Sequence, residues 1–254
     1  MKGKVSIIGS GNVAQQLAPA LKNAGYTIHQ VAGRNAAAVK RLSKGVGAGF
    51  LTDISRVTDT GGIVIIAVKD DAIADVVQKL PSLKNSLVIH TSGATDISVL
   101  KKKFRNCGVI WQIQTIKART KIDFRKVPIV IEASNASSER KLKKMARSLS
   151  GKVFVFTSSQ RKVLHLAASL SNNFVNHMYV LAEALMKKHK LPFELFGPLI
   201  LSTAESGMKD PRSAQTGPAR RNDKKTMKEH LRLLPEKKYR TLYELISKSI
   251  YQSR

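Results

Sequence analysis

The chain has 254 residues with a formal net charge of +27 and a single cysteine, Cys107. This length suffices for a buried core, and the ordinary share of apolar residues argues against a disordered protein. A single cysteine excludes an internal disulfide, and no apolar run approaches the roughly 18 residues of a membrane span. The composition therefore predicts a protein of the reducing cytoplasm.

Short apolar runs alternate with amphipathic patterns from the N-terminus to about residue 156. The runs predict strands at 5–8, 26–32, 63–68, 86–90, 108–113, 128–132 and 152–156. The amphipathic patterns predict helices at 12–24, 36–44, 71–80, 96–103 and 137–149. Strands that alternate with helices form a mostly parallel sheet with right-handed crossovers. Residues 1–156 are therefore predicted to form a doubly wound α/β domain.

The strand pattern stops near Thr157, and only helical patterns follow. They cover 161–190, 193–207 and 226–252. Residues 157–254 are therefore predicted to form an all-α C-terminal domain that binds substrate, mediates dimerisation, or both. The apolar positions in the last pattern fit a homodimer interface or an intramolecular core equally well.

A glycine-rich turn joins the first predicted strand to the first predicted helix. Gly9 makes the tight turn, Gly11 lets the backbone approach a pyrophosphate, and Ala14 lets the helix pack closely on the strand. The free N–H groups at the start of such a helix bind phosphate. In this context the motif predicts a Rossmann-type dinucleotide site, with a glycine turn that binds nothing as the alternative. The residues assigned to it are Gly9, Ser10, Gly11, Asn12 and Val13.

The end of the second predicted strand indicates which dinucleotide binds. NAD-binding proteins usually carry an acidic residue there for the ribose hydroxyls, but this chain has Arg34 and Asn35. A guanidinium group can form charge-assisted hydrogen bonds with a 2′-phosphate. The cofactor is therefore predicted to be NADP. The alternative is that Arg34 is an ordinary surface residue of a very basic protein.

Two further segments follow predicted strands and therefore lie at the edge where open α/β sheets bind ligands. Val68, Lys69 and Asp70 are expected beside the riboses of the cofactor. Residues 91–93, which are Thr91, Ser92 and Gly93, are expected near the nicotinamide. Either segment could instead be a plain turn.

Polar residues interrupt the long helical pattern after residue 161. Asparagine is a poor helix former, yet Asn172, Asn173 and Asn176 occur within twelve residues of His165. At α-helical spacing His165, Asn172 and Asn176 share one face, and Asn173 borders it. This stripe predicts a surface that faces a ligand, with a buried polar network between helices as the alternative.

These segments together resemble a known superfamily, that of pyrroline-5-carboxylate reductase and 6-phosphogluconate dehydrogenase. More closely, the chain resembles a two-domain group of predicted NADP oxidoreductases whose helical second domain has no assigned function. The matching pieces span nearly the whole chain: 8–14, 68–73, 90–93, Gln114 with Thr115, His165 with Asn173, and 215–220. The piece Gln215-Thr216-Gly217-Pro218-Ala219-Arg220 is the most specific of them.

Two departures from that group concern the predicted substrate edge. Gln112 and Lys69 stand where the group usually has proline. The chain also lacks the Lys-x-x-x-Asn pair of 3-hydroxyacid dehydrogenases, although His165 stands in the comparable region. The resemblance further implies a helical domain of a type that commonly forms dimers.

The sequence thus predicts an NADP-dependent oxidoreductase acting on a small, anionic carbonyl, imine, hydroxy or amino compound. His165 is the candidate general acid or base, since imidazole exchanges protons near neutral pH. Asn173 and Asn176 are expected to orient the substrate. The remaining predicted substrate residues are Gln114, Gln215, Thr216, Gly217, Arg220 and Arg221. The alternative is an NADP-binding regulatory or scaffold protein without turnover.

The basic residues are concentrated between 101 and 162 and include Lys117, Arg119 and Lys121. Such a field attracts polyanions at low salt. No nucleic-acid motif and few stacking aromatics accompany it, so no specific nucleic-acid partner is expected. No metal is expected either, because the six histidines never show metal-ligand spacing. The expected partners are a small-molecule substrate and a second copy of the chain.

Overall fold

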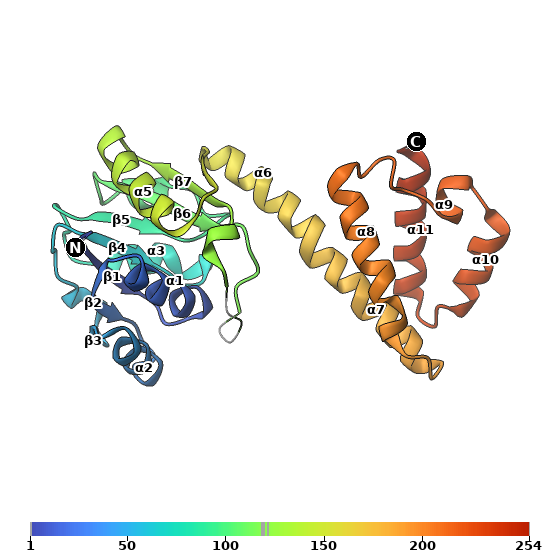
Figure 1. The fold of residues 1–254 in the computed structure, drawn as a ribbon, viewed down its shortest axis with the longest axis horizontal. Helices are drawn as coiled ribbons and strands as arrows, with labels where there is room; N and C mark the ends of the chain where they lie inside the picture. The colour runs from blue at the N-terminus through green and yellow to red at the C-terminus, as the bar shows by residue number, and fades with distance from the viewer. Residues whose placement is uncertain (1, 118–119, 121, 254) are drawn as a thin grey trace. The chain divides into compact units, whose positions relative to one another are not determined.

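The computed structural model describes residues 2–117, 120 and 122–253; Arg119 and Lys121 of the basic segment lie outside them. The chain divides into two compact units, residues 1–171 and 172–254. The first unit contains a sheet of eight strands (Figure 1). They are β1 (Lys4–Ile8), β2 (Thr27–Ala32), β3 (Gly49–Leu51), β4 (Ile63–Ile66), β5 (Leu87–His90), β6 (Cys107–Gln112), β7 (Ile129–Ala133) and β8 (Val153–Val155).

The strands lie in the order β3-β2-β1-β4-β5-β6-β7-β8. All neighbours are parallel except β6 and β7, which are antiparallel. The order reverses between β1 and β4, so the carboxyl ends of these two strands form the switch point at which such sheets bind ligands. The fold class is thus confirmed as a mostly parallel, doubly wound α/β sheet followed by a helical region.

Helices cover both faces of this sheet. They are α1 (Asn12–Asn23), α2 (Ala36–Val46), α3 (Ile73–Lys79), α4 (Ser98–Lys101) and α5 (Ala136–Leu149). One core joins α1, α2 and α5 to the sheet, and a second joins α3 and α4 to the opposite face. Strands β4 and β5 are buried along their whole length, which is why they are continuous apolar runs and do not alternate.

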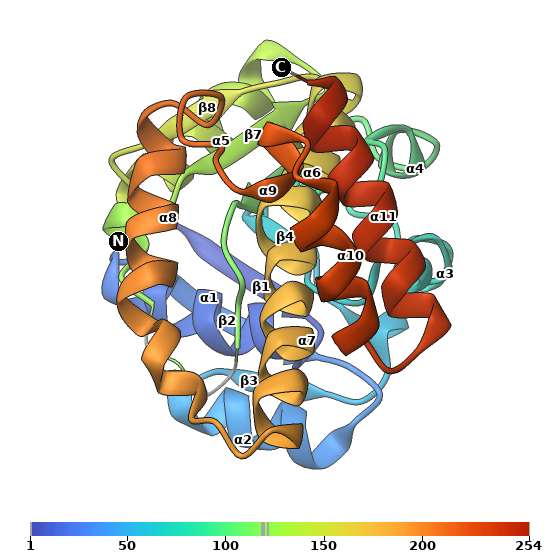
Figure 2. The same cartoon turned by 90° about the vertical axis from the view of Figure 1, so that its right-hand side faces the viewer.

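The second region is entirely helical. Its elements are α6 (Ser158–Ala168), a π-helical turn η4 (Ser169–Phe174), α7 (Val175–Lys188), η5 (Phe193–Phe196), α8 (Gly197–Lys209), α9 (Pro218–Arg221), α10 (Lys224–Leu233) and α11 (Lys237–Gln252). Within the second unit, α9 packs against both α10 and α11 (Figure 2). None of the helices in the described part of the chain is long and apolar enough to cross a membrane.

The structure differs from the sequence-based prediction in three places. Strand β3 was not predicted, because its three residues are largely exposed and carry a weak pattern. The helix predicted at 226–252 is two helices, interrupted at Pro235, whose ring removes a backbone donor and disfavours helix in the residue before it. The short helix α9 lies between the predicted helices 193–207 and 226–252, where no helix was predicted.

The strands end before the boundary between the two compact units is reached. The last strand ends at Val155, beside the expected domain boundary at 156/157. The compact units meet at 171/172, because α6 is bonded to the first unit. A capping box between Thr157 and Gln160 starts α6 directly after the sheet.

The two units differ sharply in burial. Every buried apolar residue of the described chain lies in the first unit, except Ala219. A unit with so few fully buried apolar side chains gains little from burial to offset the conformational entropy lost on folding. The isolated second unit is therefore expected to be much less stable than the first.

This asymmetry predicts the behaviour of two fragments. A fragment of residues 1–171 should unfold cooperatively in urea, with a free energy of unfolding in the usual range of about 5–15 kcal/mol. A monomeric fragment of residues 172–254 should show no cooperative transition by circular dichroism. A cooperative, monomeric 172–254 fragment would contradict the burial argument.

Candidate functional site

The turn after β1 requires glycine at its first position. Gly9 has a φ of +114°, and a Cβ atom there would collide with the carbonyl oxygen of Ala67 beyond β4. Its N–H donates to the carbonyl of Ala32 at the end of β2 with an N···O distance of 2.8 Å. Gly9 therefore joins the ends of three strands at the switch point of the sheet.

The start of α1 is open to a ligand. Gly11 caps the helix without a side-chain hydrogen bond, and no acidic residue lies in the first turn. Apart from its chain neighbours, no described residue lies within 4 Å of the position that a Cβ of Gly11 would take. Gly11 and Asn12 are exposed, and Ser10 and Val13 are half-buried. The N–H groups of this turn can therefore receive an anion.

The other predicted cofactor segments lie along the same edge. Gly33 donates to the carbonyl of Leu51 at 3.0 Å, and Thr91 donates to that of Ile66 at 3.2 Å. The position of a Cβ on Gly33 lies 3.8 Å from the backbone of Gly9. Backbone contacts thus join the ends of neighbouring strands across the sheet, from β3 through β2, β1 and β4 to β5.

Arg34 and Asn35, which follow β2, have different roles. Arg34 is exposed and has no ion pair within residues 2–117, 120 and 122–253. Asn35 caps α2, since its Oδ1 accepts the N–H of Ala38 at 3.0 Å. Arg34 is therefore available for an anionic ligand, whereas capping explains Asn35. At the end of β4, Lys69 and Asp70 are exposed, and Val68 is half-buried.

The loop after β5 is held in shape by Ser92. Its Oγ accepts the N–H groups of Ala94 and Thr95 at 3.1 and 2.9 Å, and its own N–H donates to Nδ1 of His90. Ser92 is only 5% exposed. The hydroxyl of Ser92 therefore stabilises the loop. Within residues 91–93, Gly93 is the residue that contacts other side chains.

Gly93 lies against two aromatic rings. A Cβ atom on Gly93 would lie 2.5 Å from the indole of Trp111 and 2.7 Å from the imidazole of His165. The two ring centres are 5.7 Å apart with their planes tilted by 49°. Both side chains are half-buried. The structure thus brings the predicted residues Gly93 and His165 together and adds Trp111, at the end of β6, which the prediction did not include.

Arg161 holds this arrangement and was missed by the sequence analysis. Its side chain is fully buried and forms an ion pair with Glu132 of β7 at 2.8 Å. Its Nη1 donates to the carbonyls of Ser92, Gly93 and Thr95 at 2.7–3.0 Å. The one available signal was Glu132 itself, an acidic residue within the otherwise apolar run of β7.

His90 is a buried neutral histidine beneath this loop. Burial and the nearby charge of Arg161 lower its pKa to about 3. Because Nδ1 accepts the N–H of Ser92, the proton of the neutral ring lies on Nε2. That atom has no hydrogen-bond partner in the described part of the chain. His90 therefore stays uncharged at neutral pH.

The asparagine-rich segment is not a regular α-helix. The stripe of His165, Asn172 and Asn176 was predicted for α-helical spacing, but residues 169–174 form a π-helical turn, which has more residues per turn. His165, Asn172 and Asn176 therefore do not form one straight row along the helix. Asn173 and Asn176 belong to the second unit and are exposed. Their proposed contact with substrate stays a prediction.

The loop from Gln215 to Arg221 is largely stabilised by its own bonds. Arg220 donates to the carbonyls of Arg212 and Gln215, both at 2.9 Å, and Gln215 donates to that of Thr216. Gly217 has a φ of +99°, which favours glycine. Arg221 is exposed. In the first unit, exposed Gln114 accepts the N–H of Thr115.

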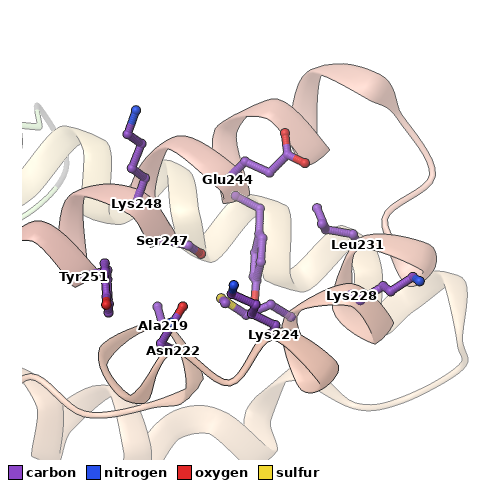
Figure 3. Close-up of a pocket in the computed structure, with 11 residues that line it drawn as sticks. Ala219, Asn222, Lys224, Lys228, Leu231, Glu244, Ser247, Lys248 and Tyr251 are labelled. Carbon is purple, nitrogen blue, oxygen red and sulfur yellow. The ribbon is translucent and has the colours of Figure 1, made fainter.

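Two hollows lie within the second unit. The smaller, of about 390 Å³, lies between α9, α10 and α11 (Figure 3). The charged ends of Lys228, Glu244 and Lys248 point away from its centre. The larger, of about 660 Å³, is lined mainly by apolar side chains of α7 and α11, and Thr216 borders it.

The described residues contain neither a candidate metal site nor a reactive thiol. They contain no group of three or more histidine, cysteine, aspartate or glutamate side chains that could hold a metal ion. Cys107 is buried within β6, and burial raises the pKa of its thiol. A protonated, buried thiol is a poor nucleophile.

Known protein families match the two parts of the chain separately. Residues 1–111 match a Rossmann-like domain, and residues 127–250 match a domain of unknown function, DUF2520. A predicted NADP oxidoreductase from Bacteroides fragilis is 38% identical over 98% of both chains, with a TM-score of 0.90. This chain belongs to the same family. No curated protein matches it.

More distant structures share the fold alone. A protein from Thermotoga maritima is 21% identical over 98% of this chain and 97% of its own, with a TM-score of 0.74. An imine reductase from Myxococcus stipitatus, solved in complex with NADP+, is 14% identical over 98% of this chain and 92% of its own, with a TM-score of 0.71. These structures show that the chain shares their fold.

The buried state of His90 predicts a pH dependence of stability. The unfolded ring takes up a proton near pH 6.5, and the folded ring only near pH 3. Stability is therefore fully present above pH 6.5 and is lost as the pH falls toward 3. Between pH 7 and 5 this loss should reach about 2 kcal/mol. Urea unfolding at both pH values measures it.

The variant His90→Asn keeps an acceptor for the N–H of Ser92 but cannot be protonated. It should remove most of this pH dependence, whereas His177→Asn, at an exposed position, should retain it. Equal pH dependence in wild type and His90→Asn would show that His90 is not the group responsible.

Proposed function

We propose that the protein is an oxidoreductase that transfers a hydride between NADP and a small, anionic carbonyl, imine, hydroxy or amino compound. The observation that carries the proposal is the open helix start at Gly11, at the switch point of the sheet, together with exposed Arg34 after β2, which has no ion pair among the described residues. The Bacteroides relative is itself described as a predicted NADP oxidoreductase, and an imine reductase of the same fold binds NADP+.

The residues at this edge fit NADP in three respects. The uncapped start of α1 can receive the pyrophosphate on its N–H groups. Gly11 leaves room for a close approach of the phosphates. Arg34 can pair with the 2′-phosphate, and no carboxylate at the end of β2 would repel it. When bound, the nicotinamide supplies the hydride chemistry.

The chain's own residues supply orientation and proton transfer. Residues 91–93 follow β5 and lie along the edge where the nicotinamide of a bound dinucleotide is expected. His165, in contact with Trp111 and adjacent to Gly93, is the group proposed to give or take the substrate proton. The half-buried indole limits the access of water to this place.

The substrate residues on the second unit remain part of the proposal. Asn173 and Asn176 are proposed to orient a carbonyl or imine group. Arg221 is a better candidate than Arg220 for an anionic group, because carbonyl oxygens already accept hydrogen bonds from Arg220. The other proposed contacts are Gln114, Gln215, Thr216 and Gly217.

The coenzyme preference tests the proposal. Arg34→Ala should weaken NADPH binding about 10- to 100-fold, the value of a charge-assisted hydrogen bond, and leave NADH binding nearly unchanged. Calorimetric titration with both coenzymes measures this. Arg140→Ala, an exposed arginine on α5, is the matched control and should bind NADPH as the wild type does. Equal losses in Arg34→Ala for the two coenzymes would contradict the assignment.

Turnover separates an enzyme from a regulatory protein. Loss of NADPH absorbance should occur with at least one compound in a panel of keto acids and cyclic imines, and His165→Gln should slow it. NADPH binding without turnover on any member of the panel would favour a regulatory or scaffold role.

We further propose that the protein works as a homodimer joined through its second unit. Large apolar side chains of this unit are exposed on α7, α8 and α11, among them Val180, Leu199 and Ile246. Before α6, the first unit exposes only Phe50, Phe154 and Val155 as large apolar side chains in its described residues. The best complement to one second unit is therefore another second unit.

Light scattering after gel filtration tests this assembly. The wild type should have twice the mass of one chain, and Leu199→Glu should shift it toward the monomer, because a buried charge opposes association. Phe50→Glu, at a position of similar exposure in the first unit, should remain dimeric. A monomeric wild type would overturn the proposal.

A further inference from the structure

We infer that Glu132 and Arg161 are positioning residues that hold His165 against Trp111 across Gly93. The catalytic role of His165 rests on the proposed function. The positioning of His165 by the ion pair can be tested without coenzyme. Glu132 lies on β7 and Arg161 on α6, and neither side chain is expected to touch the substrate.

The ion pair belongs to a polar row across the sheet. In the strand register His90 of β5 pairs with Val109 of β6, and Val109 pairs with Glu132 of β7. Paired residues point to the same face of a sheet, so His90 and Glu132 flank Val109. The carboxylate and the imidazole thus lie on one face, near the carboxyl end of β5.

Arg161 links this row to the loop after β5. One of its terminal nitrogens, Nη1, donates to the carbonyls of Ser92, Gly93 and Thr95. The other, Nη2, donates to Glu132 and to the hydroxyl of Ser158. Only the planar fork of a guanidinium reaches two such groups of acceptors at once. A lysine at this position would hold one of them at most.

The same face of α6 carries the candidate catalytic residue. Ser158, Arg161 and His165 are spaced by three and four residues and therefore share one side of the helix. Ser158 adds to the attachment, because its Oγ donates to Glu132 at 2.7 Å and accepts the N–H of Ile97 at 3.1 Å. The turn of helix before His165 is thus fixed to both β7 and the loop.

Gly93 completes the arrangement from the other side. Arg161 holds the carbonyl of Gly93, and a side chain at this position would collide with the rings of both Trp111 and His165. The ion pair therefore sets the distance of His165 from the indole through two routes, the helix and the loop. Loosening the pair should move His165 relative to Trp111 while leaving the turn at Gly9 unaffected.

The chain contains one tryptophan, so its fluorescence reports this contact directly. The imidazole of His165 lies against the half-buried indole, so acrylamide should reach the indole more easily when His165 moves away. The variant His165→Ala should therefore show stronger acrylamide quenching of the tryptophan emission than the wild type.

The decisive variants are Glu132→Gln and Arg161→Lys. Both should raise the acrylamide quenching of the tryptophan emission toward that of His165→Ala while cooperative unfolding is retained. Lys162→Gln is the matched control, because Lys162 lies on the same helix and its exposed ion pair with Asp96 is separate from the Arg161–Glu132 pair. This control should quench as the wild type does. If Glu132→Gln does not fold, Ser158→Ala, which removes two hydrogen bonds to the pair, should give the same change with smaller amplitude.

Quenching in the folded variants equal to that of the wild type would overturn the inference, whether or not the protein turns over a substrate. Where turnover is found, kcat should fall on the order of 100-fold in Glu132→Gln, with KM and NADPH affinity within about threefold of wild type. A loss of NADPH affinity with unchanged kcat would equally overturn it. Absence of all turnover would instead count against the proposed function.

Discussion

The arrangement at the candidate site depends on one buried ion pair, that between Arg161 and Glu132. Removing two charges from water costs several kcal/mol for each, and the cost is offset only where hydrogen bonds satisfy both groups. Here three backbone carbonyls and the Ser158 hydroxyl accept hydrogen bonds from the terminal nitrogens of the guanidinium, whereas its Nε has no partner in the described part of the chain. The pair joins a strand, a loop and a helix that are distant in sequence, and so places His165 beside Gly93.

A second constraint acts at the other end of the same edge. Gly9 must be glycine, because the backbone of the adjacent strand end occupies the space of a side chain. This close approach aligns the ends of β1, β2 and β4, and it directs the start of α1 toward the switch point. The cofactor end of the proposed site is therefore set by the backbone alone, whereas the His165 end is set by buried side chains.

The sequence predicted these two ends unequally, for a physical reason. The glycine turn and the strands around it are local features, so the turn at Gly9 and the order of strands and helices could be read in advance. The Arg161–Glu132 pair joins residues 29 positions apart, and three of the four other acceptors of Arg161 are backbone carbonyls, which leave no trace in the sequence. The π-helical turn at 169–174 likewise could not be distinguished from α-helix by its side chains.

We propose that NADP binds along the Gly9 edge with its nicotinamide at the place formed by Gly93, Trp111 and His165. A crystal structure of the protein with NADP+ would decide this. It should show the pyrophosphate on the N–H groups at the start of α1, the 2′-phosphate against Arg34, and the nicotinamide beside Gly93. A dinucleotide bound elsewhere, or a nicotinamide turned away from Gly93 and His165, would contradict it.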